Sequence, residues 1–501
     1  MKFKNLVKSH ILLLLASIIS LQTFTSCSTK NEYLDKKPNI IFAIADDWGW
    51  PHASAYGDAI VKTPAFDRVA SEGILFNHAY VSSPSCTPSR NAILTGQYHW
   101  RLGPGANLWS TLDTNIKVYP KLFEEAGYHV GSWRKSWGPG DLTGWKENPA
   151  GKPYESGFDE FLSEKPEDTP FCFFLGASDP HREYVPNSGA ESGIDLDKIE
   201  LYKCFPDDLS IRNDVADYYF EVQRFDNDIA NAIKKLEELG ELENTVIVVT
   251  GDNGMPFPRC KSNLYDSGTR VPLAIRWGAN IKKPGRVIDD FVSLSDIAPT
   301  FLEIAGLDIP NSMTGKSLIN IFETEKDGIV DTKNRSFVLH GKERHVPGQE
   351  ENLGGYPCRA IRTHEYLYIR NYSSDRWPSG TPDYEKSAFS GAWLADCDNS
   401  PTKTYMDNNR LKDKHHQNLW ELAFGKRSEE ELYDCKNDPF QMNNLAYDKE
   451  YFEIKEKLSK KLEKNLQETG DPRISGEYEQ FDSYPYYGSA PFHPTIDRNK
   501  E

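Results

Sequence analysis

The fold class is decided by Asn39-Ile40-Ile41-Phe42-Ala43-Ile44-Ala45, an apolar run that ends directly in Asp46-Asp47. Apolar residues at successive positions, without alternation, are typical of a strand buried on both faces of a parallel sheet. Three further runs of this kind lie at 129–133, 171–175 and 245–250. Stretches with a helical pattern separate them. The sequence therefore predicts an α/β fold in which helices sandwich a large, doubly wound, mostly parallel sheet.

The later part of the chain has a different character, and the composition shifts after about Glu323. Residues 358–372 alternate like a hairpin, and a charged helix is expected at 451–469. We therefore predict a large domain at 38–323 and a smaller C-terminal α+β subdomain at 324–501. The subdomain is expected to be built on an antiparallel sheet and to end in a tail that wraps the surface.

The N-terminus has the pattern of an export signal, because three lysines precede an apolar stretch at 11–19 that is too short to span a membrane. Phe24-Thr25-Ser26-Cys27 resembles a bacterial lipobox, in which cleavage leaves Cys27 as a lipid-bearing N-terminus. Phe24 stands where Leu is commoner, so cleavage without lipidation stays an alternative. We expect a signal peptide at 1–26, a linker at 27–37, and an exported protein of the periplasm or cell envelope, anchored to the membrane by its lipid.

Composition limits the partners of this chain. Its 501 residues include 38% hydrophobic ones, enough for a large core and more than one domain. The formal net charge is −17, so there is no basic excess to neutralise phosphates, and nucleic acid is excluded as a partner. An anionic substrate would instead need a locally positive pocket.

Cysteine spacing excludes two common classes of site. No C-x-x-C pair occurs, so neither a zinc site nor a thioredoxin-type motif is indicated. An exported protein can form disulfides, but a chain of this length does not need them, and no pairing follows from the spacing. The eight cysteines are at positions 27, 86, 172, 204, 260, 358, 397 and 435.

Oxygen donors follow two of the predicted strands. Asp46 and Asp47 end the first run, and Asp252 and Asn253 come directly after the run at 245–250. Ligands of open α/β sheets bind beyond the carboxyl ends of the strands, where these residues are expected to meet. Carboxylate and amide oxygens suit a hard cation such as Ca²⁺ or Mg²⁺. One Asp-Asp pair alone would be a solvated turn, but two such pairs at strand ends predict a metal site.

A cysteine and several cations complete the predicted site. Cys86-Thr87-Pro88-Ser89-Arg90 opens a predicted helix, whose free N–H groups and dipole favour negative charge. Lys135 and His181 follow two further strand runs, and Lys261 lies shortly after Asn253. Each of these residues alone is compatible with ordinary surface or core packing. Together they would form the positive pocket that an anionic substrate requires.

These motifs resemble the type I sulfatases, which belong to the alkaline-phosphatase-like superfamily. The resemblance rests on Cys86-Thr87-Pro88-Ser89-Arg90, the opening strand with Asp46-Asp47, and Tyr265-Asp266-Ser267-Gly268-Thr269-Arg270-Val271-Pro272. It continues in Glu431-Leu432-Tyr433-Asp434, so that it covers about residues 38–446. The heparan N-sulfatase (sulfamidase) branch is the most similar in Ala55-Tyr56-Gly57-Asp58, Asp179-Pro180-His181-Arg182 and Gly254-Met255-Pro256-Phe257-Pro258.

The resemblance implies a hydrolase that removes sulfate esters, or an N-sulfate, from a sulfated glycan. Cys86 would be converted by a maturation enzyme to formylglycine, the nucleophile, and Arg90 would steady its hydrated aldehyde. Lys135 and Lys261 would bind the sulfate oxygens, and His181 would protonate the leaving group. The ligands of a Ca²⁺ ion, preferred over Mg²⁺, would be Asp46, Asp47, residue 86, Asp252 and Asn253.

One position departs from the family pattern, which is Gly-Lys-x-His where this chain has Arg134-Lys135-Ser136-Trp137. Another base then serves, the alignment of Lys135 is shifted, or the enzyme is slow. Two alternatives stay open: a phosphonate or phosphate monoester hydrolase of the same superfamily, which shares the sheet and the metal chemistry, and a glycan-binding homologue without activity, which the departure at Trp137 suggests. Substrate contacts are expected, by charge and by stacking, from Arg182, Trp109, Trp137, Arg344 and His345.

Overall fold

The computed structural model describes residues 36–476 and 480–496. The expected signal peptide and the lipid-bearing Cys27 lie outside the described residues. Within the described part of the chain, no helix is both long enough and apolar enough to cross a membrane.

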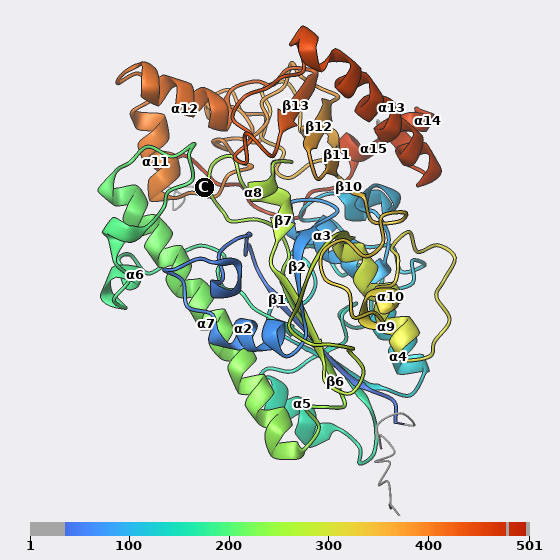
Figure 1. The fold of residues 1–501 in the computed structure, drawn as a ribbon. Helices are drawn as coiled ribbons and strands as arrows, with labels where there is room; N and C mark the ends of the chain where they lie inside the picture. Colours follow the sequence, from blue (N-terminus) through green and yellow to red (C-terminus); the bar gives the residue numbers. More distant parts are fainter. Residues whose placement is uncertain (1–35, 477–479, 497–501) are drawn as a thin grey trace, which may run out of the picture. The chain divides into compact units, whose positions relative to one another are not determined.

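A nine-stranded mixed sheet forms the centre of the larger region (Figure 1). Strand β1 (Asn39–Ala45) lies between β5 (Phe171–Gly176) and β6 (Thr245–Gly251), parallel to both, and all three strands are buried. The order is β4-β3-β5-β1-β6-β8-β2-β7, with β9 paired to β2. This arrangement confirms the predicted large, mostly parallel sheet. The remaining strands are β2 (Ile74–Tyr80), β3 (His129–Trp133), β4 (Lys152–Pro153), β7 (Arg270–Val271), β8 (Leu273–Trp277) and β9 (Arg286–Ser293).

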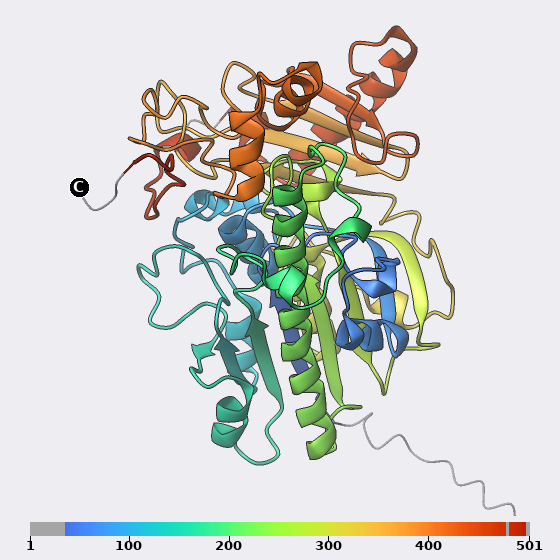
Figure 2. The ribbon, with the colours of Figure 1, turned by 90° about the vertical axis from the view of Figure 1, so that its left-hand side faces the viewer.

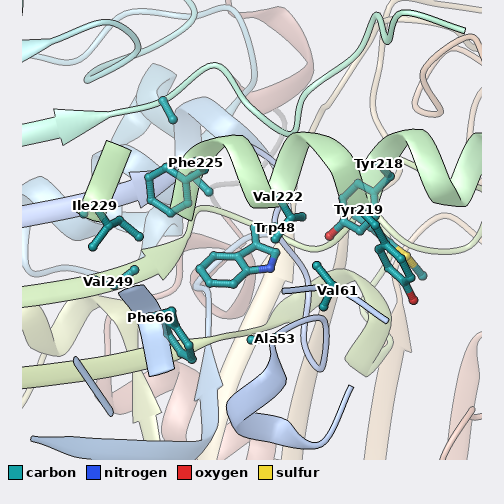
Figure 3. Close-up of a cluster of buried hydrophobic side chains, with 14 of the residues drawn as sticks. Trp48, Ala53, Val61, Phe66, Tyr218, Tyr219, Val222, Phe225, Ile229 and Val249 are labelled. Carbon is teal, nitrogen blue, oxygen red and sulfur yellow. The ribbon is translucent and has the colours of Figure 1, made fainter. Parts of the chain in front are cut away.

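Helices cover both faces of this sheet, with α7 and α2 on one side and α4, α9 and α10 on the other (Figures 1 and 2). In the core under α7, Trp48 packs edge-on against Phe66 and Phe225, at 5.1 and 5.8 Å between ring centroids (Figure 3). The α-helices are α2 (Pro64–Ser71), α3 (Cys86–Thr95), α4 (Tyr119–Glu125), α5 (Phe158–Glu164), α6 (Ser188–Glu191), α7 (Leu209–Leu239), α8 (Asp266–Thr269), α9 (Ile297–Ile304) and α10 (Ile319–Phe322). Short 3₁₀ helices lie at Ser54–Tyr56, His99–Arg101, Gly103–Ala106, Leu196–Lys198 and Leu294–Asp296.

A second, four-stranded sheet is antiparallel throughout, as predicted for the later part of the chain. Its order is β10 (Phe337–Lys342), β11 (Cys358–Thr363), β12 (Tyr366–Asn371) and β13 (Glu430–Asp434). Leu458, Leu462 and Leu466 of the charged helix α13 (Phe452–Glu468) pack in one apolar cluster with this sheet. The other helices here are α11 (Pro401–Asn408), α12 (Lys414–Phe424), the 3₁₀ turn Lys449–Tyr451, α14 (Pro472–Ser475) and α15 (Gln480–Ser483).

Candidate active site

The two predicted pairs of oxygen donors meet at the carboxyl ends of β1 and β6. Because Ala45 pairs with Gly251 in the parallel register, the residues that follow each strand are neighbours. The backbone N–H of Asp47 donates to Asp252 Oδ1 at 2.9 Å, and Asn253 Nδ2 donates to Asp47 Oδ1 at 2.6 Å. Asp47 has a φ of 73°, in the left-handed region that carboxylate residues tolerate better than most, and this turn keeps both aspartates at the strand end.

Helix α3 brings Cys86 into the same cluster, since Cys86 is its first residue. The Cys86 Sγ lies 3.3 Å from Asp46 Oδ1 and 3.9 Å from Asp47 Oδ1. One ligand atom from each of Asp46, Asp47, Cys86 and Asp252 fits within 4.8 Å of the others. The helix is buried at every position and ends at Gly96, whose φ of 63° closes it in the left-handed conformation.

This cluster, called the acidic floor below, consists of Asp46, Asp47, Cys86, Asp252 and Asn253. Burial raises the pKa of the Cys86 thiol well above its usual range, and the neighbouring Asp46 carboxylate raises it further. Burial also raises the pKa of Asp252 to about 6. For Asp46 burial acts in the same direction, but Lys135, His181 and Arg90 together outweigh it and lower the pKa. An unmodified Cys86 is therefore a neutral thiol here and a poor nucleophile.

The floor has the chemistry of a cation site. It offers three buried carboxylates, and Asn253 Oδ1 is buried without a hydrogen-bond partner among the described residues. A buried acceptor left unpaired costs free energy unless a ligand satisfies it, and a hard cation would do so. The donor set is mostly oxygen, which favours Ca²⁺ or Mg²⁺ over softer metals.

Arg90 lies one turn into α3 and contacts two carboxylates of the floor. Its Nε donates to Asp252 Oδ2 at 2.7 Å, and its terminal nitrogen lies 3.7 Å from Asp46 Oδ1. A further N–H donates to the backbone carbonyl of Lys135, which links the loop after β3 to the floor. Arg90 is fully buried, so it holds the carboxylates in place as a fixed positive charge.

Two lysines and a histidine face the floor from separate loops. Lys135 donates to Asp46, and Lys261 Nζ lies 2.7 Å from Asp47 Oδ2 and 3.1 Å from Asp398 Oδ2. His181 Nδ1 lies 2.6 Å from the Arg182 carbonyl, which can only accept, so Nδ1 carries a hydrogen. Its Nε2 is 3.9 Å from Asp47 Oδ2 and remains available to exchange a proton. All the residues predicted for catalysis or metal binding thus come together.

A cavity of about 340 Å³ opens above Cys86. Three residues predicted to contact substrate line it, namely Trp109, Arg182 and His345. His345 is buried, receives or donates a hydrogen bond at 2.8 Å between Nδ1 and Ser85 Oγ, and has a pKa lowered to about 4 by burial. The guanidinium of Arg182 is engaged in a paired contact with Asp214, at 2.6 and 3.0 Å.

Trp137 and Arg344 are not among the described residues that line the cavity. Trp137 is buried in the core that packs against α3, where its indole N–H donates to Asn91 Oδ1 at 2.6 Å. Arg344 is buried as well, and its guanidinium donates to backbone carbonyls of the C-terminal segment. Both positions therefore have packing and hydrogen-bonding roles in this structure.

The sequence did not single out Asp398 or the C-terminal residues around Tyr486, all of which line the cavity. The Asp398 carboxylate lies beside Lys261 and, with Asp47 and His181, forms a second group of ligand atoms within 4.8 Å. It stands on an irregular loop whose carbonyls at Trp393 and Cys397 both accept from the buried Lys403. No local pattern around Asp398 marks this position, because the loop reaches the site only through tertiary packing.

Comparison with known families decides the identity of this site. The sequence model described as Sulfatase matches residues 38–307, more than half of the chain. The chain belongs to the sulfatase family. The model described as N-sulphoglucosamine sulphohydrolase, C-terminal, matches residues 259–378, in agreement with the sulfamidase-like branch. The protein is accordingly a sulfuric ester hydrolase, as the motifs predicted.

Curated relatives resemble this sulfatase over most of its length. An ulvan-active sulfatase of Formosa agariphila is 29% identical over 90% of this chain and 84% of its own. The human N-sulphoglucosamine sulphohydrolase is 27% identical over 87% of this chain and 91% of its own. The similarity therefore includes both sheets, and is not confined to the motif around Cys86.

Solved structures share the fold. One, described as bound to its substrate D-glucosamine-2-N,6-O-disulfate, has a TM-score of 0.62 at 22% identity and covers 87% of this chain and 99% of its own. A phosphonate monoester hydrolase of Agrobacterium radiobacter has a TM-score of 0.63 at 17% identity, covering 86% and 96%. These likenesses confirm the alkaline-phosphatase-like architecture and do not separate hydrolysis of a sulfate ester from hydrolysis of a phosphonate ester.

Proposed function

We propose that this sulfatase releases sulfate from a sulfated saccharide, with formylglycine made from Cys86 as its nucleophile and a Ca²⁺ ion held by the acidic floor. The observation that carries the proposal is the position of Cys86: it stands between Asp46 and Asp47 at the base of a cavity lined by cations. A cation would be held by Asp46, Asp47, Asp252, Asn253 and the modified residue 86.

When bound, the cation and the hydrated aldehyde together supply a hydroxyl nucleophile at neutral pH. The residues of the chain do the rest. Lys135 and Lys261, which are paired with Asp46 and Asp47, present their ammonium groups at the floor, where they would bind the sulfate oxygens. His181 Nε2 donates the proton that the leaving oxygen or nitrogen requires, while its Nδ1 hydrogen bond fixes the ring.

The proposed dependence on maturation follows from the state of the cysteine. Its thiol is buried and its pKa is raised by burial and by Asp46, so conversion to formylglycine replaces a group that is poorly suited to attack sulfur. A formylglycine-generating enzyme is therefore a required partner. Without it, the folded chain is expected to be inactive.

A sulfated saccharide is the substrate class that the surroundings support. The cavity combines the lysines and His181 with the aromatic rings of Trp109 and Tyr486, a combination suited to a charged group on a sugar ring. The relatives, an ulvan-active sulfatase and an N-sulphoglucosamine sulphohydrolase, agree by name with an anionic glycan as substrate. Export to the periplasm or cell envelope, with a lipid on Cys27, would bring the enzyme to such polymers.

The decisive experiment compares protein produced with and without a formylglycine-generating enzyme. We expect mass spectrometry of the peptide that contains residue 86 to show the aldehyde only in the first sample, and sulfate release only from that sample. A Cys86→Ser variant, produced where only cysteine is matured, should lack turnover.

The preference for sulfate over phosphonate or phosphate esters is tested with the same matured protein. Faster turnover of a phosphonate or phosphate monoester than of any sulfated saccharide would favour the related hydrolase that shares this fold. Unmodified Cys86 in protein from the native host, together with saccharide binding and no sulfate release, would favour a binding protein instead.

A further inference from the structure

The C-terminal segment folds back across the active site and is fixed there at both ends. We call residues 480–496 the C-terminal tail. Near its start, the buried Phe481 accepts a hydrogen bond at its carbonyl from Asn107 Nδ2, at 2.8 Å. Near its end, Trp393 N–H donates to the Pro491 carbonyl at 3.0 Å, and Asn399 Nδ2 donates to the Phe492 carbonyl at 2.8 Å.

Arg344 is the main anchor between these ends. Its guanidinium donates to the carbonyls of Asp482, Tyr484 and Pro485, at 3.1, 2.7 and 3.1 Å. Only 3% of Arg344 is exposed, so these are buried, charge-assisted hydrogen bonds. In Figure 2 the red ribbon of the tail lies beside the orange loops that precede α11, in agreement with the bridge between Ala392 and Phe492.

Half-buried and exposed residues alternate along 482–489 of the tail, as in an extended chain, whereas residues 489–491 all line the cavity. Tyr486 and Ala490 line the cavity above Cys86 and belong to the apolar cluster that contains this cysteine. Tyr487, the neighbour of Tyr486, is 46% exposed. Tyr486 is therefore part of the cavity wall, and its neighbour Tyr487 is part of the surface.

Gly488 marks how closely the tail approaches the site. A Cβ atom at this position would lie 2.3 Å from Cγ of Trp109, so only glycine leaves room for the indole ring. The backbone N–H of Tyr487 donates to the Trp109 carbonyl at 2.9 Å. Trp109 N–H in turn donates to Thr87 Oγ1 at 3.3 Å, which connects the tail to the turn that bears Cys86.

From these contacts we infer that the C-terminal tail is the wall that restricts the enzyme to the terminal sugar of a sulfated chain. The cavity of about 340 Å³ lies at the lower end of the range of ~300–1,000 Å³ typical of small-molecule sites. It has room for about one sulfated ring. An internal ring carries saccharide on both sides and needs a groove that is open at both ends. The tail lines the cavity through Tyr486 and Ala490, beside Cys86, and would occupy one of these two sides. The inference rests on the proposed saccharide substrate.

Two adjacent tyrosines give a matched test. Tyr486→Ala removes a cavity wall, whereas Tyr487→Ala removes a solvent-facing ring and leaves its backbone hydrogen bond intact. We expect the matured wild type to desulfate a monosaccharide and a terminal ring of an oligosaccharide, and to leave an internal sulfated ring untouched. Tyr486→Ala should raise KM for the monosaccharide about tenfold, the effect of roughly 1.4 kcal/mol of lost binding, with kcat within about threefold. Tyr487→Ala should match the wild type.

Gly488→Ala tests the wall as a whole, because the added methyl group must displace the tail or Trp109. The ratio of kcat/KM for a terminal ring to kcat/KM for an internal ring should fall by at least about tenfold. Thermal unfolding establishes that the variant is folded. Equal effects of Tyr486→Ala and Tyr487→Ala, or desulfation of internal rings by the wild type, would overturn the inference.

Binding separates this inference from the proposed function. Calorimetry with a Cys86→Ala protein measures affinity for a sulfated monosaccharide and for an oligosaccharide sulfated only internally. Tight binding of the first and none of the second supports the wall even if no saccharide is turned over, in which case only the proposed function fails. Equal affinity for both contradicts the wall whatever the activity.

Discussion

The floor and the rim of the active-site cavity are built in different ways. The acidic floor stands at the ends of two paired parallel strands, β1 and β6, and on the first residue of α3; its side chains are at most 2% exposed. The rim comes from loops and from the C-terminal tail, and contacts between residues distant in the sequence hold it, such as Arg344 with Tyr484, 140 positions apart. Main-chain pairing between strands therefore positions the catalytic residues, whereas side-chain contacts between distant parts of the chain position the residues that select the substrate. Changes in the floor should lower kcat, and changes in the rim should act on KM.

The largest expected effect is that of Asp252→Asn in the floor. The Asp252 carboxylate accepts from Arg90 and from the Asp47 backbone, and it is one of the proposed cation ligands. We expect sulfate release to fall by at least about 10³-fold. The melting temperature of wild-type protein should rise with Ca²⁺, since a ligand at 100 times its Kd stabilises by about 2.7 kcal/mol, and this rise should disappear in the variant.

A matched control for that experiment is Asp226→Asn. Asp226 is also a buried carboxylate, but it accepts from the backbone N–H groups of Ala65 and Phe66 at the start of α2, away from the floor. Its replacement should lower the melting temperature and leave the response to Ca²⁺ unchanged. A full Ca²⁺ response in Asp252→Asn would show that the cation binds elsewhere.

The next largest expected effect is the loss of Lys261, which we compare with the loss of a second buried lysine, Lys342. Lys261 bridges Asp47 and Asp398 in the cavity, whereas Lys342 pairs with Asp396 at 2.8 Å and does not line the cavity. Lys261→Met should reduce kcat by about 10²–10³-fold, because a cation that neutralises the sulfate oxygens is lost. Lys342→Met should instead destabilise the fold, by ~3–5 kcal/mol if the pair is typical of buried ones, with kcat nearly unchanged in the folded fraction. Steady-state kinetics beside urea unfolding would separate the two, and a kcat loss common to both would argue against the distinction.

This division explains which parts of the molecule were predictable from sequence. The strands at 39–45 and 245–251 were predictable because each consists mainly of an apolar run. Parallel strands end at one edge of the sheet, so Asp46 and Asp252 were expected to lie close together. Strand β2 was not recognised, since Asn77 and His78 interrupt its apolar pattern and are only half-buried. Asp398 and the tail carry no local signal, because their role arises only when distant loops pack together.

The smallest expected effect concerns Trp137, the residue that stands where the family pattern has histidine. Its indole N–H donates to Asn91 on α3 and its ring is buried, so Trp137→Phe removes one hydrogen bond from the packing behind Cys86. We expect the free energy of unfolding to fall by about 1 kcal/mol and kcat to change less than about twofold. Trp145→Phe is the control, since Trp145 also donates to a single acceptor, the Leu112 carbonyl at 2.7 Å. A tenfold loss of kcat in Trp137→Phe alone would place the indole in the chemistry. Residues that affect kcat would then include the packing behind α3 as well as the floor. The molecule would have to be divided into three regions: the catalytic floor, the selective rim and a supporting region behind α3.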